Sequence, residues 1–196
     1  MNDDAVRDDI AFIRRTMEQG RRVAVTWGPD TLVWGIAVAI GYFGTYARVR
    51  GLWTIDTAWL WTACIVLPWA YSLRRLLHYW KAPASPMILG LKMLWLACGI
   101  FLTILGFAVI FTGEPSGWWM NVVPAGIIGI GFFVSSFLCD LAWMRWIAVI
   151  AWAGELALFV LRTRPAALLL AGALMLVLLA LPGLLLMRNH RAQAGA

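Results

Sequence analysis

Residues 146–161 read WIAVIAWAGELALFVL, an uninterrupted apolar run apart from the acidic Glu155, with Arg145 before it and Arg162 after it. At a helical rise of about 1.5 Å per residue, Glu155 lies about 15 Å from the first arginine and about 10 Å from the second. Such a run predicts a helix that crosses a bilayer. A carboxyl group near mid-membrane is costly to place there, which makes Glu155 a candidate functional residue.

The rest of the chain repeats this pattern. Of its 196 residues, 62% are hydrophobic and 13% are charged, whereas a soluble domain carries roughly 25% charged residues. A soluble fold of this length cannot hide so much apolar surface, so we expect lipid to be its solvent. The predicted fold is an all-α integral membrane protein, a six-transmembrane-helix bundle preceded by an amphipathic cytoplasmic helix. The six predicted spans are 31–47, 57–73, 87–111, 118–139, 142–161 and 166–187.

This pattern divides the chain into three parts. Residues 1–28 are predicted to form the amphipathic helix and a connector, residues 29–187 the bundle, and residues 188–196 a cytoplasmic tail. The net charge of +6 does not indicate a nucleic-acid surface, because the arginines lie at the ends of the apolar runs rather than in one patch.

The positions of the basic residues predict the orientation. With a cytoplasmic N-terminus, eleven basic residues lie in the inner segments and four in the outer ones, and Lys92, one turn inside its span, snorkels to the inner side. The excess of basic residues marks the cytoplasmic side. Both termini are therefore predicted to be cytoplasmic. The inner set is Arg7, Arg14, Arg15, Arg21, Arg22, Arg74, Arg75, Lys81, Arg145, Arg188 and Arg191, and the outer set is Arg48, Arg50, Arg162 and Arg164.

The first 22 residues show helical spacing, with Val6, Ile10, Ile13 and Met17 on one stripe. Acidic residues crowd the first half of this segment and arginines the second, in agreement with the helix dipole. Such a helix can lie on the membrane, dock on its own bundle or pair with another subunit. The candidate partner-docking residues are Ile10, Phe12, Ile13, Arg14 and Met17.

Small residues mark two spans as closely packing helices. Gly35 and Gly41 lie in the first span, and Gly126 and Gly129 in the fourth. Glycines at a membrane helix surface let another helix approach closely. The thirteen tryptophans mostly fall near span ends, typical of an aromatic belt, and we place Trp34 and Trp61 there. Three lie deeper and are predicted to pack between helices: Trp69, Trp95 and Trp152.

Four side chains are candidate partners for Glu155. Tyr42, Thr103 and Asn121 lie in the outer halves of their spans, and Arg162 follows two turns after Glu155. With such partners Glu155 can act as a polar clasp between helices. It can also handle protons or cations, or contact another subunit.

The sequence predicts neither an enzyme nor a cofactor-binding protein. The cysteines Cys64, Cys98 and Cys139 form no metal-binding spacing, and no histidine lies at membrane depth for a haem. The motifs H-E-x-x-H, G-x-S-x-G, G-x-x-x-x-G-K-[ST] and S-x-x-K are absent from the sequence, and Ser135 and Ser136 lack a nearby base. We therefore expect no catalytic residues, no metal and no cofactor.

The N-terminal segment DDIAFIRRTMEQG resembles the start of a group of uncharacterised bacterial polytopic inner-membrane proteins with an F-I-R-x-x-M-E helix. The matching residues are Phe12, Ile13, Arg14, Met17 and Glu18, and the resemblance covers about the first 45 residues. It implies a location in the bacterial cytoplasmic membrane and no catalytic activity.

These observations favour a non-catalytic membrane protein that docks a partner through its N-terminal helix or its glycine-rich helices. The expected partners are the lipid bilayer and either another protein or further copies of the chain, and not nucleic acid. A small proton-coupled transporter or channel that uses Glu155 is the first alternative. An accessory subunit of a bioenergetic membrane complex is the second.

Overall fold

The computed structural model describes residues 27–79, 86–112 and 118–194, and within these ranges the regular structure is all helical. The predicted amphipathic helix of residues 1–22 lies outside the described residues. The elements are α2 (Gly28–Val49), α3 (Thr57–Tyr79), α4 (Pro86–Thr112), α5 (Trp119–Leu138), α6 (Trp143–Val160), α7 (Ala166–Met175), the π-helical turn η1 (Leu176–Ala180) and α8 (Leu181–Ala194).

Two helices end in the same hydrogen-bonded cap. After α2, Gly51 adopts a φ of +70°, and the Leu52 N–H donates to the Ala47 carbonyl at 2.8 Å. After α5, Asp140 adopts a φ of +51°, and the Leu141 N–H donates to the Ser136 carbonyl at 3.0 Å. Both are Schellman caps, in which a residue in the left-handed region turns the chain back over the last helical turn.

The last predicted span is one continuous helix with a wider turn in its middle. The Leu181 N–H bonds to the Leu176 carbonyl, five residues back, and Pro182 follows directly. Proline lacks an N–H and its ring crowds the carbonyl four residues earlier, so a π-helical turn at this point relieves the conflict. This turn, η1, lies against α2.

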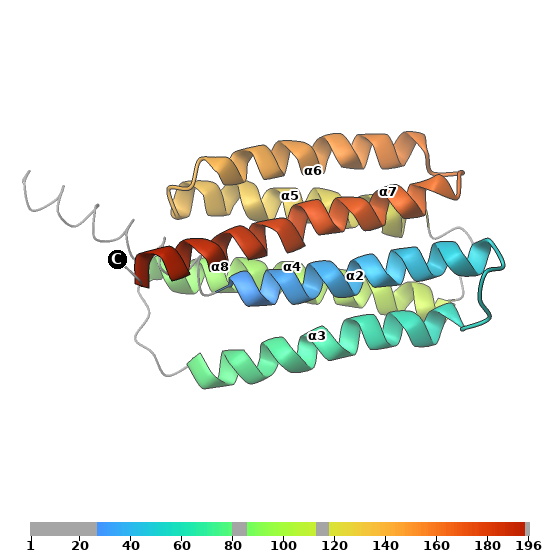
Figure 1. The fold of residues 1–196 in the computed structure, drawn as a ribbon, viewed down its shortest axis with the longest axis horizontal. Helices are drawn as coiled ribbons and strands as arrows, with labels where there is room; N and C mark the ends of the chain where they lie inside the picture. Colours follow the sequence, from blue (N-terminus) through green and yellow to red (C-terminus); the bar gives the residue numbers. More distant parts are fainter. Residues whose placement is uncertain (1–26, 80–85, 113–117, 195–196) are drawn as a thin grey trace, which may run out of the picture.

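Helix α2 lies at the centre of the bundle (Figure 1). It packs against α3 on one side and against α7, η1 and α8 on the other, while α5 packs against α6 and α4. The chain runs back and forth along the long axis, so α2 begins and α8 ends at the same end of the bundle (Figure 1). This end, which also holds the α5–α6 turn, is called the inner end below; the outer end holds the α2–α3 and α6–α7 turns.

Five of the described helical segments are long and apolar enough to cross a membrane: Gly28–Val49, Met87–Phe111, Trp119–Leu138, Trp143–Val160 and Ala166–Arg188. They correspond to five of the six predicted spans, and the fold is compatible with a multi-pass membrane protein. The remaining predicted span, 57–73, forms the first part of α3. That helix is long but less apolar, because it also carries Arg74, Arg75 and His78. Membrane crossing by α3 therefore stays a prediction.

Candidate functional site

Glu155 lies on α6 with its carboxyl group against the backbone of α5. A Cβ atom on Gly126 would stand 2.5 Å from one carboxyl oxygen and 2.7 Å from the other. The absence of a side chain at Gly126 is what makes room for the carboxyl group. Glu155 remains half-buried, so the group is neither enclosed in the core nor fully outside the bundle.

A strip of aromatic side chains surrounds this contact. Trp152 places its indole nitrogen 2.5 Å from where a Cβ on Gly129 would stand, and its ring lies 5.5 Å from that of Phe133. Towards the outer end, Phe159 meets Trp118 edge-on at 5.7 Å. We call this surface the α5–α6 seam; its residues are Trp118, Gly126, Gly129, Phe133, Phe137, Trp152, Glu155 and Phe159.

Arginines lie over both ends of the seam. The Arg145 guanidinium is 4.7 Å from the centre of the Phe137 ring. At the outer end, the Arg162 guanidinium is 4.7 Å from the Phe159 ring and 5.8 Å from that of Trp118, and it also donates to the Phe159 carbonyl. These cation–π contacts keep both charges at the ends of the helix pair, away from Glu155.

The predicted partners of Glu155 are not brought together around it. Tyr42 donates to the Met120 carbonyl at 2.8 Å, Thr103 donates to the Gly99 carbonyl at 2.7 Å, and Arg162 is held by the aromatic rings described above. Asn121 lies half-buried in the first turn of α5. Among residues 27–79, 86–112 and 118–194, the Glu155 carboxyl group has no hydrogen-bond partner. The hydroxyl groups of Tyr42 and Thr103 and the guanidinium of Arg162 have other partners, so a polar clasp between Glu155 and these residues stays a prediction.

The polar contacts between helices are made instead by tryptophan and hydroxyl side chains. Trp61 of α3 donates to Thr45 of α2 at 3.0 Å, and Trp69 of α3 donates to Thr103 of α4 at 2.7 Å. Trp95 of α4 donates to Ser135 of α5 at 3.0 Å. We call these three contacts the indole clasps.

All three indole clasps share one local pattern. The accepting hydroxyl donates in turn to the carbonyl of the residue four positions earlier, and in each case that residue is glycine. The indole ring lies over the same glycine: the nearest ring atom is 2.9, 3.6 or 3.1 Å from where its Cβ would stand. A Gly-x-x-x-Ser/Thr spacing puts both residues on one helix face, so a flat indole can pack on the glycine and donate to the hydroxyl. The pairs are Gly41–Thr45, Gly99–Thr103 and Gly131–Ser135.

A fourth contact of this kind ends in an ion pair near the inner end. Trp34 donates to Ser72 at 3.1 Å, and Ser72 donates to Asp30 at 3.0 Å. The other carboxyl oxygen of Asp30 lies 3.0 Å from an Arg75 guanidinium nitrogen. This network ties α2 to α3. Trp34, like Trp61, therefore donates a hydrogen bond between helices in addition to its predicted place in the aromatic belt.

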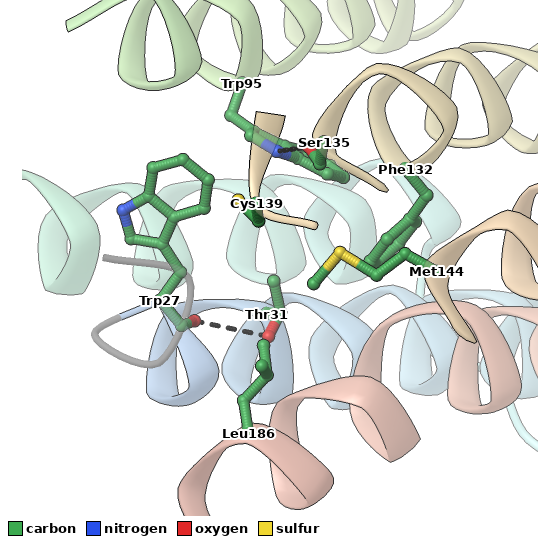
Figure 2. A pocket seen from close by; sticks show the side chains of 8 residues that line it. All are labelled: Trp27, Thr31, Trp95, Phe132, Ser135, Cys139, Met144 and Leu186. Carbon is green, nitrogen blue, oxygen red and sulfur yellow. Dashed lines mark hydrogen bonds between the residues drawn. The ribbon is translucent and has the colours of Figure 1, made fainter. Parts of the chain in front are cut away.

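A small cavity of about 10 Å³ lies between the described helices (Figure 2). Side chains from α2, α4, α5, α6 and α8 converge on it near the inner end of the bundle. This volume is about the space of one water molecule. Its lining does not include Glu155; it consists of Trp27, Thr31, Trp95, Phe132, Ser135, Cys139, Met144 and Leu186.

The four predicted packing glycines all contact other parts of the same chain. A Cβ on Gly35 would stand 2.5 Å from the Ala180 backbone nitrogen in η1, and one on Gly41 would stand 2.9 Å from the Trp61 ring. Gly126 and Gly129 receive α6, as described above. The glycine-rich faces of α2 and α5 are therefore occupied inside the bundle.

Sequence reasoning missed a second close helix approach. Gly28 and Gly183 face each other where α2 and α8 begin: a Cβ on Gly183 would stand 2.6 Å from the Gly28 carbonyl oxygen. It also missed the hydroxyl acceptors Thr45, Ser72 and Ser135. For two of these, the glycine four residues earlier is a signal that the sequence carried.

No cluster of three or more metal-binding side chains occurs within the described ranges, where all three cysteines are free. Comparison of the whole chain with protein-family models, curated proteins and solved structures gives no match.

Proposed function

We propose that this chain is a non-catalytic, multi-pass protein of the bacterial cytoplasmic membrane that docks a partner protein through its N-terminal helix. The topology we propose has six spans, with α3 as the second, and both termini in the cytoplasm. The excess of basic residues in the inner segments supports this orientation. The N-terminal resemblance to bacterial inner-membrane proteins supports the location.

The observation that carries the proposal is the way polar groups are used inside the bundle. The indole clasps and the Asp30–Arg75 network join α2, α3, α4 and α5 by hydrogen bonds within the chain. One of the clasps, Trp95–Ser135, lines the small cavity, whose volume of about 10 Å³ is the space of about one water molecule. A bundle tied in this way is suited to be a rigid anchor, so its function is expected at its surface.

The same contacts favour the N-terminal helix over the glycine-rich helices as the docking element. The glycines of α2 and α5 that would admit a partner helix are in contact with η1, Trp61 and α6. We therefore place the docking surface on the apolar stripe of Ile10, Ile13 and Met17.

Transport through Glu155 is the weaker proposal. It needs a hydrated route to the carboxyl group, whereas the cavity of Figure 2 is lined by other residues and is too small for a pathway. An accessory role in a larger membrane complex is a special case of docking, and the identity of a captured partner would reveal it.

Affinity capture of the full-length protein from mild detergent tests the proposal. The variant Ile13→Asp places a charge on the apolar stripe of the N-terminal helix, and Ala11→Asp makes the same charge change on another face. We expect the captured partner to be lost with Ile13→Asp and kept with Ala11→Asp. Partners that are the same for both variants and the wild type, or that are also kept when residues 1–22 are removed, would refute docking through this helix.

A further inference from the structure

Glu155 differs from the hydroxyl side chains that link the helices. Tyr42, Thr45, Thr103 and Ser135 each hydrogen-bond to a backbone carbonyl. The Glu155 carboxyl group meets the Gly126 backbone and has no hydrogen-bond partner among the described residues. A carboxyl group without a partner in hydrocarbon is unfavourable even as the neutral acid, so it favours a donor and an acceptor from beyond the described residues.

The cations of the same helix pair do not meet this requirement. Arg162 is bound to the rings of Phe159 and Trp118 at the outer end, and Arg145 lies over Phe137 at the inner end. Lipid headgroups also lie at the ends of the span, about two helical turns away from Glu155. Another membrane-embedded polypeptide would bring a partner to the level of Glu155.

The seam is open to such a partner. Phe133, Trp152 and Phe159 are 40%, 37% and 45% exposed, and Leu156 and Val160 beside them are 66% and 71% exposed. The carboxyl group lies within this apolar surface and is held in place by the glycine below it. A helix that packs on the seam would bury the rings and meet the carboxyl group together.

We propose that the partner is a second copy of this chain, docked seam to seam, with the two Glu155 carboxyl groups hydrogen-bonded to each other across a two-fold axis. A neutral carboxylic acid has one donor and one acceptor side, so two of them satisfy each other with two hydrogen bonds. A two-fold interface places the same residue of both copies at its centre, which provides this match without any further polar residue. Because the seam offers no basic side chain at the level of Glu155, this pairing fits its chemistry. The proposal does not depend on docking by the N-terminal helix.

Dimerisation in lipid bilayers tests the proposal. Full-length protein, labelled with a fluorophore and diluted into vesicles, is counted by single-molecule photobleaching across a range of protein-to-lipid ratios. We expect a dimer for the wild type. Glu155→Leu keeps the apolar surface and removes the hydrogen bonds, and we expect it to lower the dimer association constant about tenfold. Glu155→Gln keeps a self-complementary amide, and we expect its constant to stay within about threefold of the wild type.

Cysteine cross-linking locates the interface. Leu156→Cys lies next to Glu155 and beside the seam, and Leu169→Cys lies on an exposed position of α7. The wild type reports the background of the native cysteines. Oxidation in membranes is expected to cross-link Leu156→Cys and not Leu169→Cys. The proposal would be overturned by a wild type that is monomeric at all protein-to-lipid ratios or by a Glu155→Leu variant that dimerises as the wild type does. It would also be overturned if both Glu155 variants lost dimerisation equally, or if the two cysteines cross-linked equally. Capture of a different protein by a monomeric wild type, lost with Glu155→Leu, would overturn it in favour of a foreign helix.

Discussion

Replacement of Gly35 by alanine should loosen the contact between α2 and the π-helical turn η1. The new Cβ would stand 2.5 Å from the Ala180 backbone nitrogen and 2.9 Å from the Leu179 Cβ, and backbone atoms cannot rotate away. Overpacking costs up to about 3 kcal/mol, and alanine returns about 1 kcal/mol of helix propensity. The expected net loss in the free energy of unfolding is therefore about 2 kcal/mol.

Gly90 and Gly99 of α4 provide matched controls. A Cβ on Gly90 meets nothing within 4 Å, so Gly90→Ala should stabilise the protein by about 1 kcal/mol through helix propensity alone. A Cβ on Gly99 would meet the Trp69 ring at 3.6 Å, which is ordinary contact, so Gly99→Ala should be neutral or slightly stabilising. Reversible unfolding from mild detergent into dodecyl sulfate, followed by the fluorescence of the 13 tryptophans, measures all three. If Gly35→Ala were as stable as Gly90→Ala, η1 would not lie on α2 as described.

Two further predictions concern one indole clasp and the cap after α5. Trp95→Phe and Ser135→Ala each remove one side of an indole clasp whose bond is 3.0 Å long, and each should cost about 1 kcal/mol. The double variant should lose about 0.6 kcal/mol less unfolding free energy than the sum of the two single losses. If the two losses were strictly additive in the same unfolding assay, the hydrogen bond would not contribute. Asp140→Gly should stabilise by about 1 kcal/mol because glycine adopts a φ of +51° without strain; a lower midpoint of unfolding would contradict the cap geometry.

Much of the helical framework was predictable because the sequence marks its own helix ends. The start of α2 is set by Pro29 at the first helical turn, and its end is set by Gly51 with a positive φ. Five predicted spans coincide with helices that are long and apolar enough to cross a membrane, because the length and composition of each run were visible in the sequence. Whether α3 crosses the membrane was not predictable in the same way, because its apolar half continues without a break into Arg74 and Arg75.

The pairing of side chains across helices was much less predictable. Helical periodicity gives the face on which Thr45 or Ser135 lies, but it does not identify the helix that this face meets. For the same reason Tyr42 and Thr103 were expected near Glu155 from their depth alone, although Tyr42 meets Met120 of α5 and Thr103 meets Trp69 of α3. Depth in the membrane constrains one coordinate of a side chain, whereas a hydrogen bond requires all three.

The spacing of the indole clasps explains why the α5–α6 seam differs from the other contacts. Lipid is as apolar as leucine, so close packing on small residues and hydrogen bonds must hold membrane helices together. In the clasps, the residue four positions after each glycine is Ser or Thr, which binds the indole N–H. On the seam, the residues four positions after Gly126 and Gly129 are Ile130 and Phe133, so neither glycine is followed by a hydroxyl group. Helix α6 still approaches α5 closely, but α5 offers no hydrogen-bond partner to the Glu155 carboxyl group or the Trp152 indole. This is the physical reason why we place the partner of Glu155 in a second chain.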